Sequence, residues 1–274
     1  WKTFPALLCG NTVVVKSHGL TPYVAVWFGK ILKEAGLPAG VFNVIQGFGA
    51  EVGKSLVEDG RIKFVSFTGS ARTGSSILKS TADRLVKVSI EAGGKNPFVV
   101  CDDADLEKAA NAAIAGSFVD AGQRCAATSR IIIFEKVYDK FRKLFLEKVS
   151  KLKIGINDSD DYGAIISEKR MDEILAATES AVGRGTALLA GGRRIGNKGY
   201  FMAPTVLEKI SPDDILSHNE LFGPVVAFYK VEDLDKAIDL ANKSEFRLSS
   251  AIHTKDMDSA EKFINKHLTG VVRV

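Results

Sequence analysis

Apolar residues in the first ninety positions switch between short runs and helical spacing. The run TVVVK predicts a strand over residues 12–16, because β-branched side chains favour extended chain. Residues 21–36 repeat apolar positions three and four apart, which predicts a helix with Thr21 as N-cap and Pro22 in its first turn. Strands are expected at 41–45, 62–67 and 85–90, and helices near 50–58 and 71–82. This alternation predicts a parallel sheet with helices on its faces.

The hydrophobic pattern changes near Glu91, where EAGGKNP is predicted to be a loop. Strands are predicted at 98–101, 130–134, 186–190, 247–253 and 270–274, and helices at 106–119, 137–152, 168–183, 232–243 and 256–267. We therefore expect an α/β protein of two lobes, residues 1–92 and 93–274, the second with an α/β sheet of its own.

Composition narrows the classes of function. The chain is 46% hydrophobic and 26% charged, as in a soluble globular protein, and its net charge of +4 comes from 37 basic and 33 acidic residues. This mild excess favours an anionic ligand weakly and predicts no nucleic-acid partner. We expect no membrane partner, because no apolar run reaches spanning length and no signal peptide opens the chain.

Three cysteines, at positions 9, 101 and 125, lack the spacing of a disulfide scaffold or a zinc site. We accordingly expect a reducing, cytoplasmic compartment and no metal site. The first residue is Trp1 rather than Met, so a fragment or a processed product is expected.

Two glycine-rich turns each follow a predicted strand and precede a predicted helix. The first, GFGAEVG, contains Gly49, and the second, FTGSARTG, contains Gly69, Ser70 and Gly74. Glycine lets a backbone approach phosphate closely, and the helix that follows offers free N–H groups. Neither turn matches G-x-G-x-x-G, so each alone is more often plain loop chemistry. Together they favour a dinucleotide site.

Cys125, in DAGQRCAATSR, is either a reactive thiol or a small buried apolar residue. A nearby cation, such as Arg124, and a helix N-terminus would both favour the nucleophilic thiolate. Glu91 ends an apolar strand, where partial desolvation would suit a general base, although a solvated loop glutamate is the commoner case. Glu220, in HNELFGPVV, is either solvated or a ligand clamp. Lys16 closes the first strand, where a lysine can reach a phosphate or ribose.

Taken together, these segments resemble the aldehyde dehydrogenase superfamily of the NAD(P)-dependent, CoA-independent type. The matching stretches, in family order, are PALLCGNTVVVK, LPAGVFNVIQGFGAEVG, FTGSARTG, EAGGKNPFVV, GQRCAATSR, ELFGPVV and TGVVRV. The resemblance covers the whole chain. It implies a Rossmann-like coenzyme lobe over 1–92 and a catalytic lobe over 93–274, both incomplete.

The resemblance also implies roles for individual residues. Cys125 is the nucleophile that forms a thiohemiacetal and then a thioester, and Glu91 is the base that activates water. In the coenzyme site, Lys16 and Gly49 serve the adenosine end, Gly69, Ser70 and Gly74 the pyrophosphate, and Glu220 with Phe222 the nicotinamide end. The partner is a small aldehyde, and family members form homo-dimers or tetramers.

Two departures from the family pattern matter. Gly19 stands where many NAD-using members have a ribose-binding glutamate, so we favour NADP, or use of both cofactors, over NAD alone. The chain also begins after the family segment that resembles PWNFP, whose asparagine donates to the oxyanion, and it lacks the C-terminal strand. Two other functions therefore stay open, a noncatalytic binding or assembly module and a CoA- or phosphate-dependent semialdehyde dehydrogenase.

Overall fold

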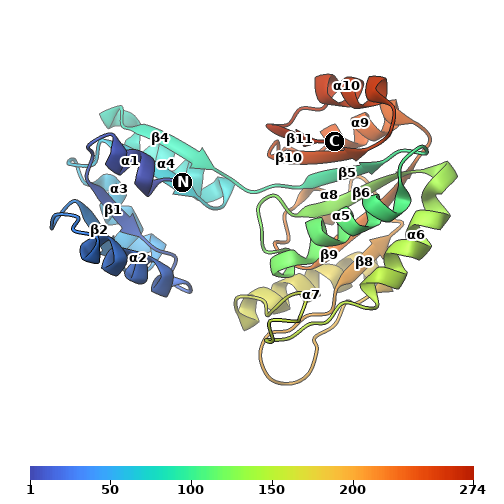
Figure 1. Cartoon of the computed structure of the whole chain (residues 1–274), viewed down its shortest axis with the longest axis horizontal. Coiled ribbons are helices and arrows are strands. Elements are labelled where there is room, and N and C mark those ends of the chain that lie inside the picture. Colours follow the sequence, from blue (N-terminus) through green and yellow to red (C-terminus); the bar gives the residue numbers. More distant parts are fainter. The chain divides into compact units, whose positions relative to one another are not determined.

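A computed structural model describes every residue of the chain, from Trp1 to Val274. The chain divides into two compact units, Trp1–Ala92 and Gly93–Val274 (Figure 1). Each unit forms its own hydrogen-bonded sheets, and no strand ladder joins one unit to the other.

The first unit contains two separate two-stranded parallel sheets. Strand β1 (Val13–Lys16) pairs with β2 (Phe42–Ile45), and β3 (Phe64–Thr68) pairs with β4 (Lys87–Glu91). Its α-helices are α1 (Thr3–Leu8), α2 (Pro22–Glu34), α3 (Lys54–Glu58) and α4 (Ala71–Thr81). The single parallel sheet that we expected here is wrong, because no ladder links either strand of the first pair to the second pair.

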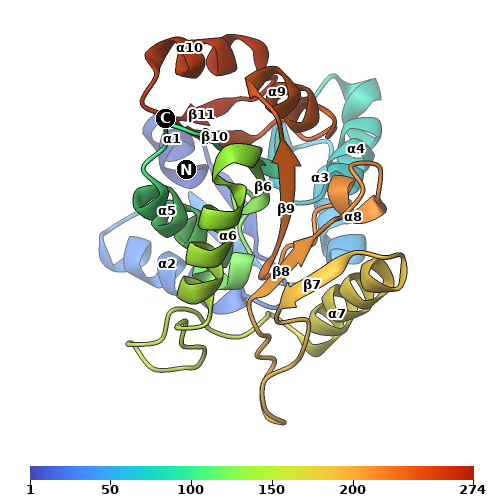
Figure 2. The same ribbon diagram turned by 90° about the vertical axis from the view of Figure 1, so that its right-hand side faces the viewer.

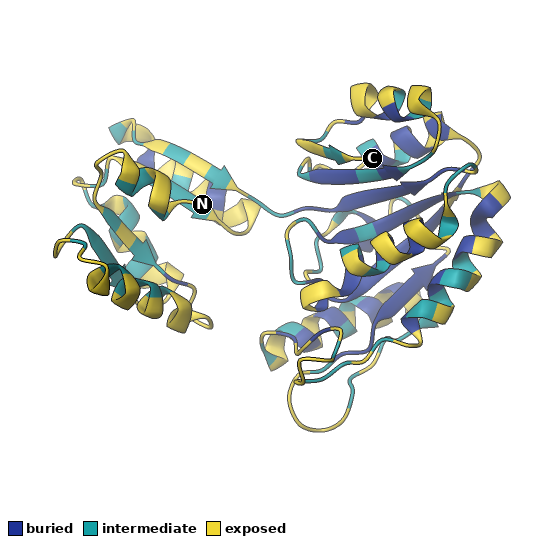
Figure 3. Cartoon of the chain, in the orientation of Figure 1, coloured by how far each residue is buried: buried dark blue, intermediate teal, exposed yellow.

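Helix α2 forms where the apolar spacing predicted it. Thr21 occupies the N-cap but makes no capping hydrogen bond, so Pro22, with its fixed φ, provides the local start signal. No residue of α2 is buried, and Val24, Trp27 and Ile31 are exposed. In Figure 3 this unit is mostly exposed or intermediate, and only Ser17, Gly74 and Thr81 are buried.

The second unit is built on one seven-stranded sheet of order β11-β10-β5-β6-β9-β8-β7 (Figure 2). Every neighbouring pair is parallel except β7 and β8, which are antiparallel. The strands are β5 (Asn96–Val100), β6 (Thr128–Phe134), β7 (Ala187–Ala190), β8 (Thr205–Glu208), β9 (Val225–Val231), β10 (Ser249–His253) and β11 (Val271–Arg273). The antiparallel edge makes this sheet mixed.

Six α-helices accompany this sheet. They are α5 (Leu106–Phe118), α6 (Glu135–Val149), α7 (Glu168–Gly183), α8 (Ile215–His218), α9 (Leu234–Asn242) and α10 (Met257–Lys266). Four of the longer ones begin with a side chain that accepts a backbone N–H, from Asp105, Ser167, Asp233 and Asp256. These caps satisfy donors that a helix start leaves free.

The core of the second unit lies around β5, β6 and β9, which are buried along most of their length. Val99 and Ile132 are fully buried, as expected for central strands of a parallel sheet covered on both faces. Arg130 of β6 is also buried, and its guanidinium donates to the carbonyl oxygens of Lys95, Leu240 and Ala241. Burial lowers the pKa of Arg130 to about 10. This side chain ties the start of β5 to the end of α9.

Candidate active site

Cys125 lies in a turn between the short 3-10 helix η3 (Val119–Gly122) and strand β6. Asp120, Ala121 and Gly122 have φ values of 56°, 55° and 66°, so three successive residues adopt the left-handed conformation that L-residues disfavour. The Cys125 thiol is exposed, which excludes the buried alternative considered from the sequence. No helix begins at Cys125, since the next element is β6.

The residues on the amino side of Cys125 bind to the surrounding chain. Arg124 donates to the carbonyl oxygens of Ala115 and Gly116, at 2.8 and 3.0 Å, in the last turn of α5. Its guanidinium therefore satisfies the end of a helix, where a cation is favourable. Gln123 accepts the N–H of Ile166 at 2.8 Å. These contacts fix the turn to two different segments.

Asn96, the first residue of β5, holds the carboxyl side of the same turn. Its Nδ2 donates to the carbonyl oxygens of Cys125 and Ala127, both at 2.8 Å, and its Oδ1 accepts the N–H of Ser249 at 3.1 Å. Gly94 makes room for this arrangement, because a Cβ atom there would lie 2.7 Å from the Asn96 amide and closer still to the Cys125 carbonyl oxygen. Sequence reasoning missed Asn96, although the quoted EAGGKNP segment contains it.

Glu220 lies against the same glycine pair. Its Oε1 accepts the N–H of Gly94 at 3.0 Å, and a Cβ atom on Gly93 would lie 2.7 Å from its carboxyl carbon. The side chain is half-buried, so it is not a freely solvated loop residue. Burial raises the pKa of Glu220, while the Gly94 N–H and the charges of Lys95 and Arg170 act in the opposite direction. Segment 93–96 therefore contacts both the Cys125 turn and the Glu220 carboxylate.

Lys95, inside this segment, is 5% exposed. Burial is the main cause that lowers its pKa to about 7; Arg130 lowers it further and Glu220 raises it. Near neutral pH its ammonium charge is therefore sensitive to what lies beside it. No pattern in the sequence distinguished Lys95 from the many surface lysines.

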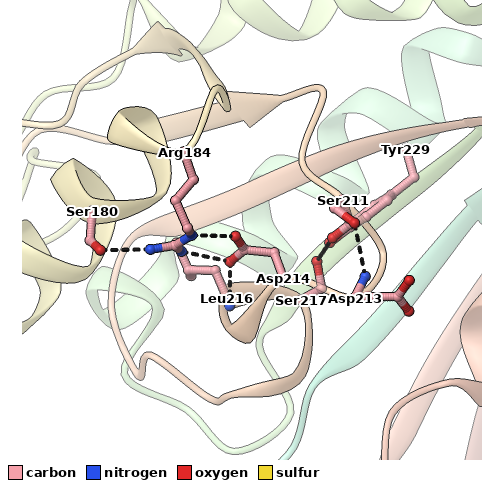
Figure 4. A network of polar contacts seen from close by, with 8 residues as sticks. All are labelled: Ser180, Arg184, Ser211, Asp213, Asp214, Leu216, Ser217 and Tyr229. Atoms are coloured by element: carbon pink, nitrogen blue, oxygen red, sulfur yellow. Dashed lines mark hydrogen bonds and ion pairs between the residues drawn. The ribbon is translucent and has the colours of Figure 1, made fainter.

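The helix that precedes Glu220 is anchored by the polar network in Figure 4. Asp214 accepts the N–H of Leu216 at 2.8 Å and receives two hydrogen bonds from Arg184, at 2.8 and 2.9 Å. The Arg184 guanidinium lowers the pKa of Asp214. Ser217 and Tyr229 share a hydrogen bond of 2.7 Å. The network fixes α8 to the end of α7 and to β9, and Glu220 follows two residues later.

Phe222 has a left-handed φ of 52° and is 38% exposed. Before it, the Leu221 carbonyl oxygen accepts a hydrogen bond from Arg170. After it, Gly223 packs so tightly that a Cβ atom would lie 2.5 Å from Ile174 Cδ1. Backbone strain of this kind persists only where neighbouring contacts hold it. The 220–224 loop is thus a constrained segment.

In the first unit, Lys16 ends β1 and lies against the first glycine-rich turn. Its Nζ donates to the carbonyl oxygens of Ser17 and Gly47, at 2.6 and 3.2 Å. Gly49 starts the π-helix η1 (Gly49–Gly53), and a Cβ atom there would meet nothing within 4 Å. The structure therefore brings Lys16 to this turn.

The second glycine-rich turn lies at the end of β3, next to Glu91. The N–H of Gly69 donates to the Glu91 carbonyl oxygen at 3.0 Å, and the Glu91 side chain is exposed. Ser70 is the N-cap of α4 and accepts the N–H of Thr73 at 3.3 Å. Gly74 allows close packing on β4, because a Cβ atom would lie 3.0 Å from Ile90.

The helix that follows this turn can offer its N-terminus to an anion. The first turn of α4 has no acidic residue, so the positive end of the helix is not neutralised. The residues of this turn therefore fit an anionic group such as a phosphate.

No group of three or more histidine, cysteine or acidic side chains in the chain is arranged to hold a metal ion. None of its helices combines the length and the apolar character needed to span a membrane.

Solved structures show the same fold. Lactaldehyde dehydrogenase from Escherichia coli aligns with a TM-score of 0.97 at 34% identity, covering 99% of this chain and 58% of that chain. Betaine aldehyde dehydrogenase from Staphylococcus aureus, in complex with NAD+, aligns with a TM-score of 0.96 at 34% identity, covering 100% of this chain and 55% of that one. The fold is thus the α/β fold of aldehyde dehydrogenase structures.

Residues 1–274 match the aldehyde dehydrogenase family, and the chain belongs to that family. Alpha-ketoglutaric semialdehyde dehydrogenase of Bacillus subtilis is 38% identical over 280 residues, which cover 100% of this chain and 57% of that protein. The chain spans about half the length of the curated relatives that it matches.

Proposed function

We propose that this chain belongs to an enzyme that oxidises an aldehyde to a carboxylic acid with a nicotinamide cofactor. One observation carries the proposal, the exposed thiol of Cys125 on a turn whose backbone is held on both sides. Family membership supports aldehyde oxidation as the reaction class. The relatives are named for different aldehydes, so their names do not favour one substrate for this chain.

In the proposed reaction, the Cys125 sulfur attacks the aldehyde carbon and forms a thiohemiacetal. Negative charge develops on the former carbonyl oxygen, and no hydrogen bond of the chain uses the Cys125 N–H, which is free to donate to it. A bound nicotinamide cofactor would supply the acceptor for the hydride that leaves this carbon. A thioester remains on Cys125. Glu91 takes a proton from water, which attacks the thioester, releases the acid and restores the thiol.

The residues that would hold the cofactor are those that the family resemblance implies. Ser70 and the glycines at 69 and 74 would hold the pyrophosphate, and Lys16 with Gly49 the adenosine end. Glu220 would bind the nicotinamide ribose, with Phe222 beside the ring. Gly19 supports NADP, or both cofactors, because no carboxylate at that position repels a 2′-phosphate.

The test measures formation of NADH and NADPH from a panel of aldehydes. Cys125→Ser should abolish formation, while Cys9→Ser, the same change at the other exposed cysteine, should leave it unchanged. Equal activity in Cys125→Ser would contradict the proposal. Cofactor binding without turnover in the unmodified chain would favour a noncatalytic module, and turnover that needs CoA or phosphate would favour a semialdehyde dehydrogenase of that type.

A further inference from the structure

Asn96 is only 3% exposed, and its side chain forms three hydrogen bonds to the main chain. All three are inside the second unit, and they connect β5 with the Cys125 turn and with the start of β10. Buried polar groups are normally paired, but three contacts to two separate segments are more than pairing requires. Asn96 therefore links the start of β5 to the Cys125 turn and to β10.

The residue after Asn96 explains why an amide side chain stands here. Pro97 has no N–H, so the backbone of β5 cannot donate at that point. The register between β5 and β6 also shifts there, from Asn96 opposite Thr128 to Pro97 opposite Arg130. The Asn96 amide supplies the donors that the strand lacks and directs them to the carbonyl oxygens of Cys125 and Ala127.

Two hydrogen bonds orient the peptide groups on either side of Cys125, and Asn96 donates one of them. In a planar trans peptide, C=O and N–H point in opposite directions. The Arg124 carbonyl oxygen accepts the N–H of Ala127 at 3.0 Å, and the Cys125 carbonyl oxygen accepts from Asn96. The peptide groups before and after Cys125 are therefore both held by their oxygens, which leaves the Cys125 N–H in a fixed direction.

We propose that Asn96 is a positioning residue for Cys125, whose amide holds the turn so that the thiol and the Cys125 N–H act together on one carbonyl group. The inference deepens the proposed function and rests on Cys125 being the nucleophile. Asn96 does not touch the substrate in this proposal. It acts by keeping the attacking sulfur and the oxyanion donor in one arrangement, and small misplacements of such groups are costly.

Two reactions of the same thiol separate positioning from general reactivity. Acylation by p-nitrophenyl acetate passes through a tetrahedral oxyanion, forms a thioester and releases p-nitrophenolate. Alkylation by iodoacetamide displaces iodide and forms no oxyanion. Neither reaction needs cofactor or dehydrogenase turnover, so failure of the proposed function and failure of this inference are distinguishable. Both reactions use the thiolate, so a change in its fraction alters both rates alike and cancels in their ratio.

The variant is Asn96→Asp, which keeps an acceptor for Ser249 but loses both donors. Asn242→Asp is the matched control, since Asn242 also donates to a main-chain carbonyl, of Lys266, and accepts a main-chain N–H, from Leu268. All proteins carry Cys9→Ser, so that Cys125 is the accessible thiol. We expect Asn96→Asp to lower the ratio of acylation to alkylation by about tenfold or more, and Asn242→Asp to leave it within about twofold.

An unchanged ratio in folded Asn96→Asp would overturn the inference, and so would an equal fall in Asn242→Asp. A lower unfolding midpoint with the ratio unchanged would assign Asn96 a purely structural role. Circular dichroism checks folding, and Asn96→Ser, which also loses both contacts to the turn, replaces Asn96→Asp if that protein does not fold. For Asn96→Ser the same loss of ratio is expected.

Discussion

Gly122 and Gly223 approach so closely that a Cβ atom on Gly122 would lie 2.7 Å from the carbonyl carbon of Gly223 and closer still to its oxygen. Gly122 belongs to the segment that leads into Cys125, and Gly223 to the loop that carries Glu220. Both residues are in the second unit. The two loops therefore touch backbone to backbone, and neither can move far without the other.

Gly122→Ala should destabilise the protein by about 2–4 kcal/mol, because the residue is left-handed and its Cβ has no room. Gly183→Ala is the control, since Gly183 ends α7 with nothing within 4 Å of an added Cβ. That change should leave stability unchanged or raise it by up to about 1 kcal/mol. Urea unfolding measures both. Equal stabilities for the two variants would contradict the close packing.

Gly19→Glu should weaken NADPH binding by about tenfold relative to NADH, because a carboxylate repels the 2′-phosphate. The structure tolerates a side chain there, with nothing within 4 Å of an added Cβ and no left-handed φ. Gly60→Glu makes the same change at another open glycine and should leave the preference unchanged. Fluorescence titration with each reduced cofactor measures the ratio. If Gly19→Glu changed the affinities for NADPH and NADH by the same factor, position 19 would have no role in the choice between the two cofactors.

His267 should make the second unit lose stability between about pH 6.5 and 4. Burial, and then Arg130 and Arg247, lower its pKa from 6.5 to about 4. In that range the unfolded chain binds a proton that the folded chain does not, so the free energy of unfolding falls as pH falls.

His267→Asn, which can still donate to Asn242, should reduce this loss by about 2 kcal/mol between pH 7 and 4.5. Denaturant unfolding followed by circular dichroism at both pH values measures it. The exposed His18, changed to Asn, is the control and should leave the loss as in the unmodified chain. If His267→Asn lost as much unfolding free energy between pH 7 and 4.5 as the unmodified chain, His267 would not be the source of the pH dependence.

Local sequence patterns predicted the central strands and most helices. RIIIF is part of β6, and helix 106–119 is α5 to within one residue. The same patterns missed β8 and β9, because these short apolar runs directly follow proline or a glycine-proline pair, which are typical of loops. They also predicted one sheet in the first unit where there are two, since periodicity identifies extended residues but not their partners.

Sequence reasoning identified Cys125 and Glu220 as residues of interest, but not what holds them. The contacts of Asn96 and of the glycines at 93, 94, 122 and 223 join segments up to 153 residues apart, as in the bond from Ser249 to Asn96. Local spacing carries no information about such pairs. The sequence also suggested that Arg124 could activate Cys125 as a nearby cation. In the structure the Arg124 guanidinium instead donates to carbonyl oxygens at the end of α5.

The most direct test of the central claim is to trap the thioester on Cys125. Glu91→Gln should slow hydrolysis, so that aldehyde and oxidised cofactor give a burst of about one reduced cofactor per chain. Mass spectrometry of the digested protein should then find the acyl group on the peptide that contains Cys125. Reduced cofactor formed at that level with no acyl group on Cys125, or with the group on Cys9 instead, would contradict the account.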